Sequence, residues 1–385
     1  MQGVRISLVT ETFPPEINGV AMTLSRLVEG LRGRGHQVGV TRPGRPDLDP
    51  PGPDELRVPG VPIPGYSNMR MGLPYGWRLR RHWLAERPDV VHVATEGPLG
   101  AAAILTASAL RLPVTSSFHT RFDHYCKHYR VPWLERPVRA WLRHLHNRAH
   151  ATLVPTAAMA DRLRAQGFKA VRVLSRGVDT RLFHPDHRDE SLRRAWGAEP
   201  DTLVLLYVGR IAAEKNLDLL FDTQAAMRQA SIDHRLVLVG EGPRLEALRA
   251  RHPQALFVGP KRGMELARHY ASADLFLFPS LSETYGNVTQ EAMASGLAVL
   301  AYAEAAAAEL IREGGNGRLV APGDKHAFMT TAVELGADAS QRMRLAAAAR
   351  EGVLARDWSE VVGEFEQVLR AAADGRASGV AEAVA

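Results

Sequence analysis

Along most of the chain, a short apolar run rich in β-forming residues is followed by a turn and then by a helical pattern. These runs fall into two series. The first series begins near Val4, Val38, Asp89, Val114, Ala151 and Val171. The second begins near Leu203, Arg235, Leu256, Asp274, Ala298 and Gly317. Alternation of this kind is typical of parallel sheets with crossover helices, and two series predict two doubly wound α/β domains.

The length of the chain also favours two domains, because 385 residues are too many for one ordinary core. The two series meet at residues 177–185, where a strand gives way to turn residues. No strand follows the last helical patterns, roughly residues 339–373. We therefore predict a first domain at residues 1–180, a second at 181–356, a C-terminal helix at 357–373 and a flexible tail at 374–385.

Composition indicates an ordinary soluble enzyme, with 23% charged residues and 45% hydrophobic ones. Cys126 is the only cysteine, which excludes an internal disulfide and fits a reducing compartment. Residues 4–10 are too short and too polar-flanked for a signal peptide, and the apolar run at 101–110 has only the length of a buried helix. We expect a cytoplasmic protein.

The net charge of +6 is unevenly distributed along the chain. Residues 1–185 carry 26 Lys and Arg against 14 Asp and Glu, a net charge of +12, whereas the other 200 residues carry 22 against 28, a net charge of −6. This asymmetry predicts an anionic partner for the N-terminal half.

Two glutamates separated by seven residues, Glu283 and Glu291, follow the apolar run at residues 275–280. Gly286 lies between them, where a helix is expected to start, and it allows the backbone N–H groups there to approach a phosphate. A carboxylate accepts hydrogen bonds from hydroxyl pairs, so sugar or ribose hydroxyls are natural partners for both glutamates. A solvated helix start, where Glu is common, explains the pair equally well at this point.

Other loops that follow predicted strands carry candidate ligand groups. Arg210 and Lys215 flank a helix start and together could neutralise a diphosphate, while Lys261 and Arg262 are candidates for the base edge of a nucleotide. His119 ends a strand of the first domain. Each loop alone could be an ordinary solvated turn. Because ligands of doubly wound sheets bind at the carboxyl ends of strands, the shared position favours a binding site.

The loop after the first strand contains Asn18-Gly19, one site of close backbone approach at a helix start. It lacks the Gly-x-Gly-x-x-Gly fingerprint, which argues against a nicotinamide enzyme. With Phe118-His119-Thr120, Gly177-Val178-Asp179, Gly209-Arg210, Lys215 and the Glu283–Glu291 pair, residues 4–370 resemble family-4 retaining glycosyltransferases. That family has the GT-B architecture, two Rossmann-like domains facing across a cleft.

The resemblance implies an N-terminal acceptor-binding domain, a C-terminal nucleotide-sugar-binding domain, and a C-terminal helix that packs back on the first domain. Arg210 and Lys215 would bind the diphosphate and stabilise the leaving group, Glu283 would bind the hexose and Glu291 the ribose. His119 would lie near the reaction centre. The implied catalytic residues are His119, Arg210, Lys215 and Glu283. The implied donor-binding residues are Gly19, Arg210, Lys215, Lys261, Arg262, Glu283, Gly286, Asn287, Val288 and Glu291.

Two positions depart from the family pattern. Residues 305–308 are Ala-Ala-Ala-Ala before Glu309, where many members have Gly-Gly before Glu, and Arg176 replaces the usual Asn before Gly177. Both departures bear on subfamily rather than class.

The residue types also predict features of the mechanism. No Asp-x-Asp metal motif follows a suitable strand, and Asp47-Leu48-Asp49 lies in a Pro/Gly-rich loop that is typical of a turn, so we expect a metal-independent reaction. No carboxylate nucleophile can be identified beside His119, and front-face retention, as the family implies, needs none. No cofactor is expected beyond the nucleotide-sugar co-substrate.

Aromatic and basic residues are interleaved at residues 68–83 and 124–148, a combination typical of interfacial membrane contacts. The candidate acceptor or membrane residues are Trp77, Trp83, Arg121, Tyr125, Lys127 and Arg130. Tryptophans in a core and arginines on a solvated face would explain the same pattern. Nucleic acid is a rival anion, but no recognisable nucleic-acid-binding module is present.

Residues 96–100 and 118–120 are most similar to the branch that glycosylates diacylglycerol or phosphatidylinositol-type lipids. We therefore expect transfer of a hexosyl group from a UDP- or GDP-sugar to a membrane lipid, with the protein peripheral at the inner face of the plasma membrane. The alternatives are transfer to a soluble or polysaccharide acceptor, a non-catalytic anion- or membrane-binding protein, and another two-Rossmann enzyme such as a nucleotide-sugar epimerase.

Overall fold

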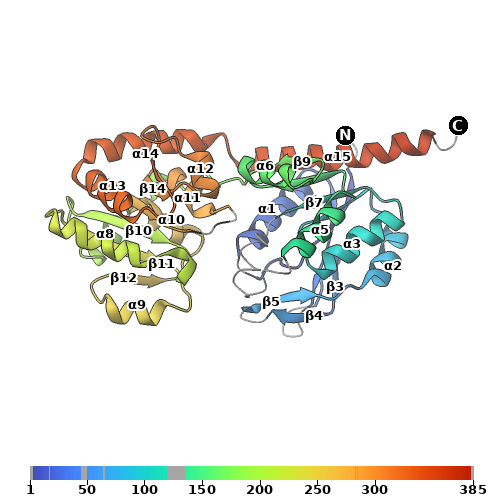
Figure 1. Cartoon of the computed structure of the whole chain (residues 1–385), viewed down its shortest axis with the longest axis horizontal. Helices are drawn as coiled ribbons and strands as arrows, with labels where there is room; N and C mark the ends of the chain where they lie inside the picture. The colour runs from blue at the N-terminus through green and yellow to red at the C-terminus, as the bar shows by residue number, and fades with distance from the viewer. Residues whose placement is uncertain are drawn as a thin grey trace. The chain divides into compact units, whose positions relative to one another are not determined.

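The computed structural model describes residues 3–16, 18–44, 50–63, 66–118, 135–281, 283 and 285–382. The chain forms two compact units (Figure 1). Unit 1 comprises Met1–Arg176 together with Trp358–Ala385, and unit 2 comprises Gly177–Asp357. Each unit is built around its own parallel sheet.

Unit 1 contains a seven-stranded sheet with the order β3-β2-β1-β6-β7-β8-β9, in which every neighbouring pair is parallel. Its strands are β1 (Arg5–Val9), β2 (Gln37–Pro43), β3 (Glu55–Val58), β6 (Val90–Val93), β7 (Val114–Ser117), β8 (Ala151–Val154) and β9 (Val171–Val173). Strands β6, β7 and β8 are buried along their whole length, as expected for parallel strands covered on both faces.

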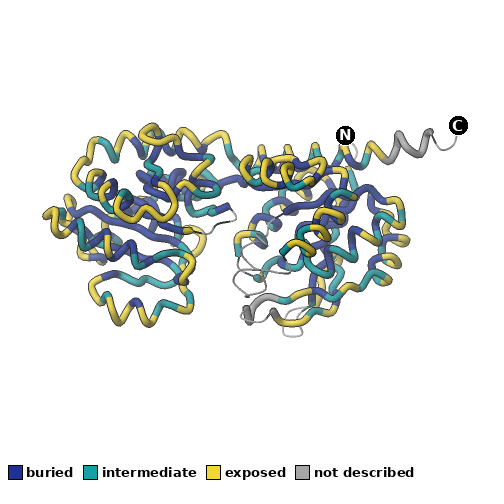
Figure 2. Tube along the Cα trace, viewed as in Figure 1, coloured by how far each residue is buried: buried dark blue, intermediate teal, exposed yellow. Residues whose placement is uncertain are grey.

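The helices of unit 1 leave their outer faces exposed, while the central strands β6, β7 and β8 are buried (Figure 2). They are α1 (Gly19–Gly33), α2 (Gly76–Glu86), α3 (Pro98–Ala109), α5 (Glu135–His146), α6 (Ala157–Ala165) and α15 (Trp358–Glu382). Helix α15 returns from the end of the chain and packs on α1 and the sheet, burying Val362, Phe365 and Leu369 in the core that contains Leu24. A Cβ on Gly30 of α1 would lie 2.5 Å from a methyl of Val362, so only glycine permits this close packing.

Unit 2 contains a six-stranded parallel sheet with the order β12-β11-β10-β13-β14-β15. Its strands are β10 (Leu203–Val208), β11 (His234–Val239), β12 (Leu256–Gly259), β13 (Leu275–Phe278), β14 (Ala298–Tyr302) and β15 (Arg318–Val320). Its helices are α7 (Glu190–Ala195), α8 (Asp218–Gln229), α9 (Leu245–Arg251), α10 (Gly263–Ala271), α11 (Asn287–Ala294), α12 (Ala305–Leu310), α13 (Lys325–Ala337) and α14 (Ala339–Leu354). Strands β10, β13 and β14 are fully buried and form the centre of the core.

The predicted fold class, two doubly wound α/β halves, is confirmed. All twelve predicted strands exist, and each begins within one residue of its expected start. Three further strands were missed: β3, and the antiparallel hairpin of β4 (Gly60–Ile63) and β5 (Tyr66–Gly72). These strands lie in a segment interrupted by Pro and Gly, which masks the apolar runs on which the prediction depended.

The chain passes from unit 1 to unit 2 at residues 176–177 and returns at 357–358. At these points Val178 pairs with Asp357, and the Val178 N–H donates to the Arg356 carbonyl at 3.0 Å. A flexible tail was expected at residues 374–385. Helix α15 instead continues through Asp374 to Glu382.

Candidate active site

The loops at the carboxyl ends of β10 and β11 pack backbone against backbone in unit 2. A Cβ on Gly240 would lie 1.9 Å from the Gly209 carbonyl oxygen, and one on Gly242 would lie 2.4 Å from that of Ile211. The Ile211 N–H donates to the Glu241 carbonyl at 2.8 Å. These glycines therefore hold the loop that carries Arg210 directly against the neighbouring loop.

Lys215 and Glu283 form an ion pair that joins the loops after β10 and β13. Lys215 ends a short 3-10 turn (Ala213–Lys215), and its Nζ donates to Glu283 Oε1. The two side chains are only 15% and 14% exposed, so each charge is offset by the other in a partly buried position. The two residues were expected to bind different parts of one ligand, and the structure places them in direct contact.

Arg210 lies beside this pair on the same loop. Its guanidinium is 44% exposed and lies 3.4 Å from Glu214 Oε1, a contact of the surface kind. A hydrogen bond fixes its backbone: the buried Tyr207 phenol donates to the Arg210 carbonyl at 3.0 Å. Burial, together with the charges of Glu283 and Glu214, raises the pKa of Tyr207 well above its usual value, so this donor stays protonated.

Gly286 starts α11 in the left-handed conformation, with φ of 90°. A Cβ here would lie 3.5 Å from Glu283 Cγ, so Glu283 packs against the start of the helix. The first turn of α11, which includes Asn287 and Val288, presents backbone N–H groups at the same edge of the sheet as Lys215. This arrangement suits an anion.

Glu291 lies on the second turn of α11 and is partly buried. The Tyr270 phenol donates to its Oε2 at 2.9 Å. Burial raises the pKa of Glu291 to about 7, and the bond from Tyr270 lowers it only in part. Tyr270 was not predicted from the sequence, because an aromatic residue on the apolar face of a helix carries no local sign of a polar partner.

Lys261 and Arg262 lie after β12, the strand at the edge of the unit 2 sheet. Arg262 is the residue that precedes α10, and Lys261 Nζ pairs with Glu265 Oε1 at 2.5 Å. In the sheet order β12 and β13 lie on opposite sides of β10. Lys261 and Arg262 are thus at the carboxyl end of the strands, as Lys215 is, but on the side of β10 that is opposite the Glu283 loop.

In unit 1, Gly19 is the first residue of α1, and Asn18 caps the helix. The Asn18 side-chain oxygen accepts from the N–H groups of Val20 and Ala21 at 3.1 and 2.9 Å. Arg176, one of the departures from the family pattern, donates to the Gly19 carbonyl at 3.4 Å. The Gly19 backbone is exposed at the carboxyl end of β1.

Glu11, in the loop after β1, was not among the residues predicted to have a functional or structural role. Its carboxylate accepts hydrogen bonds from the backbone N–H groups of Gly72, Leu99 and Gly100, and so joins the β4–β5 hairpin to the first turn of α3. Burial raises its pKa to about 7, despite these three bonds. A Cβ on Gly97 would lie 2.2 Å from Glu11 Oε1, so that loop closes on the carboxylate.

Comparison with known proteins identifies the class. Residues 17–182 match the model described as Glycosyltransferase Family 4, and residues 202–338 match the one described as Glycosyl transferases group 1. A GDP-mannose-dependent alpha-mannosyltransferase of Mycobacterium tuberculosis is 36% identical over 383 residues, 96% of this chain and 98% of that protein. The chain belongs to glycosyltransferase family 4. The family predicted from the sequence motifs is thereby confirmed, and the protein is a glycosyltransferase.

Two other proteins are similar to this glycosyltransferase, one in sequence and one in structure. The alpha-monoglucosyldiacylglycerol synthase of Streptococcus pneumoniae is 28% identical over 316 residues, 78% of this chain and 71% of that protein. The crystal structure of Anabaena Alr3699/HepE in complex with UDP superposes with a TM-score of 0.78 at 18% identity, over 95% of this chain and all of that one. The second likeness shows the shared fold.

The acceptor-side predictions for the glycosyltransferase have different outcomes. Trp83 was wrongly expected at the surface: it is 2% exposed and packs in the core of unit 1, where its Nε1 donates to Ser7 Oγ at 2.9 Å. Trp77, by contrast, is 65% exposed. The other predicted residues lie outside the described part of the chain, as does the predicted catalytic His119; they are Arg121, Tyr125, Lys127 and Arg130.

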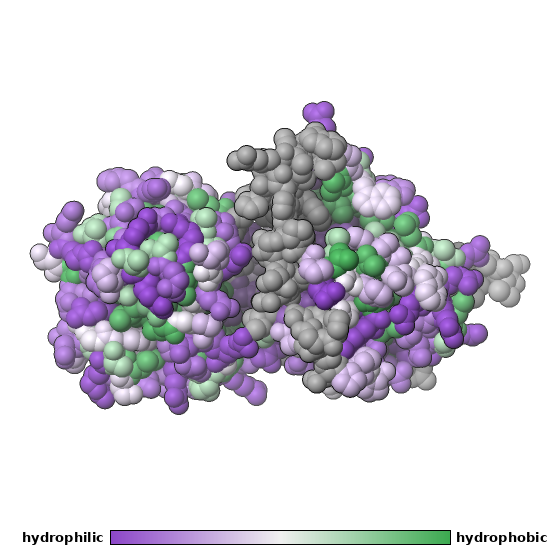
Figure 3. All heavy atoms as spheres, turned by 90° about the horizontal axis from the view of Figure 1, so that it is seen from below, coloured by the Kyte–Doolittle hydropathy of each residue, from purple (hydrophilic) through white to green (hydrophobic). Residues whose placement is uncertain are grey.

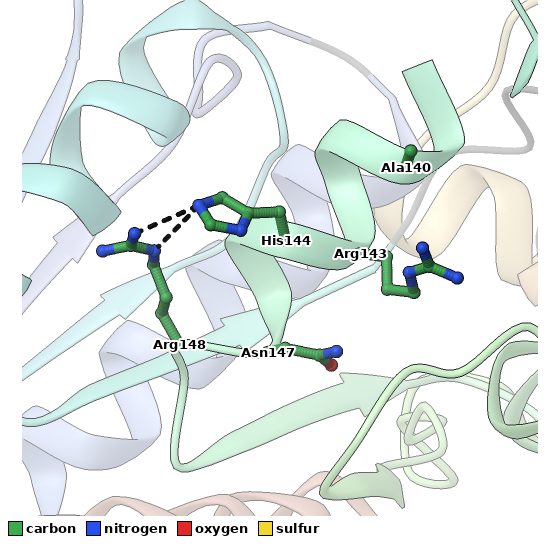
Figure 4. A pocket seen from close by; sticks show the side chains of 5 residues that line it. All are labelled: Ala140, Arg143, His144, Asn147 and Arg148. Carbon is green, nitrogen blue, oxygen red and sulfur yellow. Dashed lines mark hydrogen bonds between the residues drawn. The ribbon is translucent and has the colours of Figure 1, made fainter. Parts of the chain in front are cut away.

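A basic pocket lies on helix α5 of the glycosyltransferase (Figure 4). It is lined by Ala140, Arg143, His144, Asn147 and Arg148. Arg148 donates to His144 Nε2 at 3.0 Å, and Asn147 donates to the Gly167 carbonyl at 3.1 Å. Arg143 and His144 belong to the last turn of α5, where basic residues also complement the helix dipole, and Asn147 and Arg148 follow the helix.

Hydrophobic residues on the face seen in Figure 3 form patches between hydrophilic ones. No helix in the described ranges is long and apolar enough to span a bilayer. Within those ranges, no three His, Cys, Asp or Glu side chains gather as a group that could hold a metal ion.

Proposed function

We propose that the protein transfers a hexosyl group from a UDP- or GDP-sugar to a membrane lipid, with retention of configuration and without a metal ion. The observation that carries the donor part is the Lys215–Glu283 pair beside the start of α11, with Glu291 one turn further along that helix. The names of the similar mannosyltransferase and glucosyldiacylglycerol synthase support a sugar nucleotide and a lipid.

In this proposal the diphosphate binds at the loop after β10 and at the first turn of α11. The pair with Glu283 fixes the position of Lys215, so its ammonium can donate to the leaving diphosphate as negative charge develops there, without large rearrangement. Arg210, with a half-exposed guanidinium on the same loop, adds a second cation. The backbone N–H groups of Asn287 and Val288 complete the anion site.

Glu283 and Glu291 bind the two ends of the donor. Glu283 packs against Gly286 next to Lys215, close to where the last phosphate and the hexose would lie. Glu291, deeper along α11, accepts hydrogen bonds from the ribose hydroxyls. Neither carboxylate acts as the nucleophile, and we propose that His119 contributes to the reaction.

We place the acceptor at unit 1, whose charge and surface suit an anionic membrane. Helix α2 exposes Trp77, Arg80, Arg81 and Leu84, which recur at the spacing of one helical face. A face that combines basic residues with Trp and Leu is what an interfacial contact needs.

One transfer assay tests the proposal. The purified protein is incubated with UDP- and GDP-sugars, with and without chelator, together with vesicles that contain diacylglycerol or phosphatidylinositol. We expect a glycolipid product that is insensitive to chelator and has the anomeric configuration of the donor. Transfer only to soluble glycans would refute the lipid acceptor, an inverted product would refute retention, and chelator-sensitive transfer would refute metal independence.

Vesicle flotation tests the membrane face separately. The double substitution Arg80→Glu, Arg81→Glu should abolish binding to anionic vesicles, and salt should weaken binding of the unaltered protein. Arg344→Glu changes an exposed residue of unit 2 and serves as the control. Equal flotation of the α2 variant and the control would argue against the α2 face.

A further inference from the structure

We propose that Tyr270 is a positioning residue for the donor: its phenol holds the Glu291 carboxylate in the orientation that receives the ribose hydroxyls. This inference rests on the proposed function, because it requires Glu291 to bind ribose. It concerns a residue of α10 that lies 21 positions before Glu291 in the chain and contributes no charge of its own.

The geometry leaves the phenol little freedom. Tyr270 lies in the last turn of α10 and is fully buried. Its ring meets Phe183 edge to face at a centroid distance of 5.6 Å and lies 5.9 Å from Phe276. Aromatic packing on two sides fixes the ring plane, and the hydroxyl reaches Glu291 Oε2 at 2.9 Å.

The hydrogen bond restricts rotation of the carboxylate about its last side-chain bond. An ionised carboxylate has about four acceptor positions, and the phenol occupies one of them on Oε2. The remaining positions, on Oε1 and on the far side of Oε2, are sufficient for the two adjacent hydroxyls of a ribose. A carboxylate free to rotate would lose conformational entropy when it bound that pair, and the bond from Tyr270 removes part of this cost in advance.

A purely structural role explains the pair less well. A buried carboxylate is costly unless several donors satisfy it, and Tyr270 is the only hydrogen-bond donor to Glu291 found in the described part of the chain. Burial raises the pKa of Glu291 to about 7, because the single hydrogen bond from Tyr270 offsets only part of the cost of removing the charge from water.

The test separates an effect through the ribose from a general effect on the site. Dissociation constants of GDP, UDP and their 2′,3′-dideoxy counterparts are measured by titration calorimetry for the unaltered protein and for Tyr270→Phe. We expect the substitution to weaken binding of GDP or UDP by about three- to tenfold, the range typical of one lost hydrogen bond. Binding of the dideoxy counterpart should be unchanged, because without ribose hydroxyls the orientation of Glu291 has no effect.

Tyr285→Phe is the matched control. Tyr285 is also buried, and its phenol donates to Gln290, the residue before Glu291 on the same helix, at 3.1 Å. Loosening of α11 by loss of that bond should change the affinities for ribose and dideoxy nucleotides by the same factor. The inference is supported if the loss of affinity is confined to the ribose nucleotides and occurs in Tyr270→Phe but not in Tyr285→Phe.

Two results would overturn the inference, and they differ from failure of the proposed function. Equal weakening of ribose and dideoxy forms in Tyr270→Phe would make Tyr270 a packing residue only, and no change for either form would remove it from the site. If the unaltered protein bound neither GDP nor UDP, the proposed function itself would fail and this inference with it.

Discussion

Glu291→Gln should stabilise the ligand-free protein at neutral pH while it weakens nucleotide binding. The substitution keeps the size of the side chain and an oxygen that can accept from Tyr270, but it removes the charge from a partly buried position. Charged groups retained in a site for binding often cost stability when the ligand is absent. Glu291 offers a direct measure of that cost, because its burial is reflected in its pKa.

The magnitude follows from the difference between the ordinary pKa of 4.5 and the folded value of about 7. Between these pH values the native state binds more protons at Glu291 than the unfolded state, so its contribution to stability falls as pH rises through this range. The difference corresponds to about 3 kcal/mol, at about 1.4 kcal/mol per tenfold change in proton affinity. Below pH 4.5 both states are protonated and this cost disappears.

The assay is urea unfolding of the two proteins at a series of pH values from 4.5 to 8. The free energy of unfolding of Glu291→Gln, minus that of the unaltered protein, should increase by up to about 3 kcal/mol across this range. Desolvation of the new amide subtracts about 1–3 kcal/mol at every pH and leaves the slope unchanged. Glu11, whose pKa is also raised to about 7, contributes equally to both proteins and cancels. Parallel stability curves for the two proteins would refute the reasoning.

Three further predictions test other parts of the structure. Lys215→Met should weaken binding of GDP or UDP by at least about tenfold, measured by calorimetry; unchanged affinity would remove Lys215 from the diphosphate site. Gly240→Ala should lower the free energy of unfolding by at least about 3 kcal/mol, because the new Cβ would collide with the Gly209 carbonyl. Gly33→Ala is the control: its Cβ would meet open space, so the free energy of unfolding should fall by less than about 1 kcal/mol. Burial lowers the pKa of His92 from 6.5 to about 3, so the unfolded state binds the extra proton and unit 1 should lose stability as pH falls below 6.5. His92→Asn should flatten that part of the pH profile, and an unaltered profile would contradict the assignment.

The strands could be predicted because a central parallel strand is buried on both faces and must be apolar along its length. Strand β10, Leu203–Val208, has all six residues buried and is recognisable without any knowledge of its neighbours. The hairpin of β4 and β5 is different. Its strands are stabilised by pairing with each other, and their apolar pattern is broken by Pro62 and by flanking glycines.

Trp77 and Trp83 show the limit of composition as evidence for a surface. Both occur in one run of basic and aromatic residues, six positions apart. On helix α2 this separation places them on different faces, so Trp83 packs in the core and Trp77 is exposed. Which face turns inward depends on where α2 rests on the rest of unit 1.

The sequence by itself determined the family, the two-domain α/β fold and the loops that carry the candidate site, because these depend on local apolar patterns and on short motifs after strands. It also identified Lys215, Glu283 and Glu291 as individual residues. Only the tertiary structure decided how they are partnered: Lys215 with Glu283 across 68 positions, and Glu291 with Tyr270 across 21. Such pairs form where parallel strands and helices bring distant loops to one edge of a sheet, and no local pattern encodes that proximity.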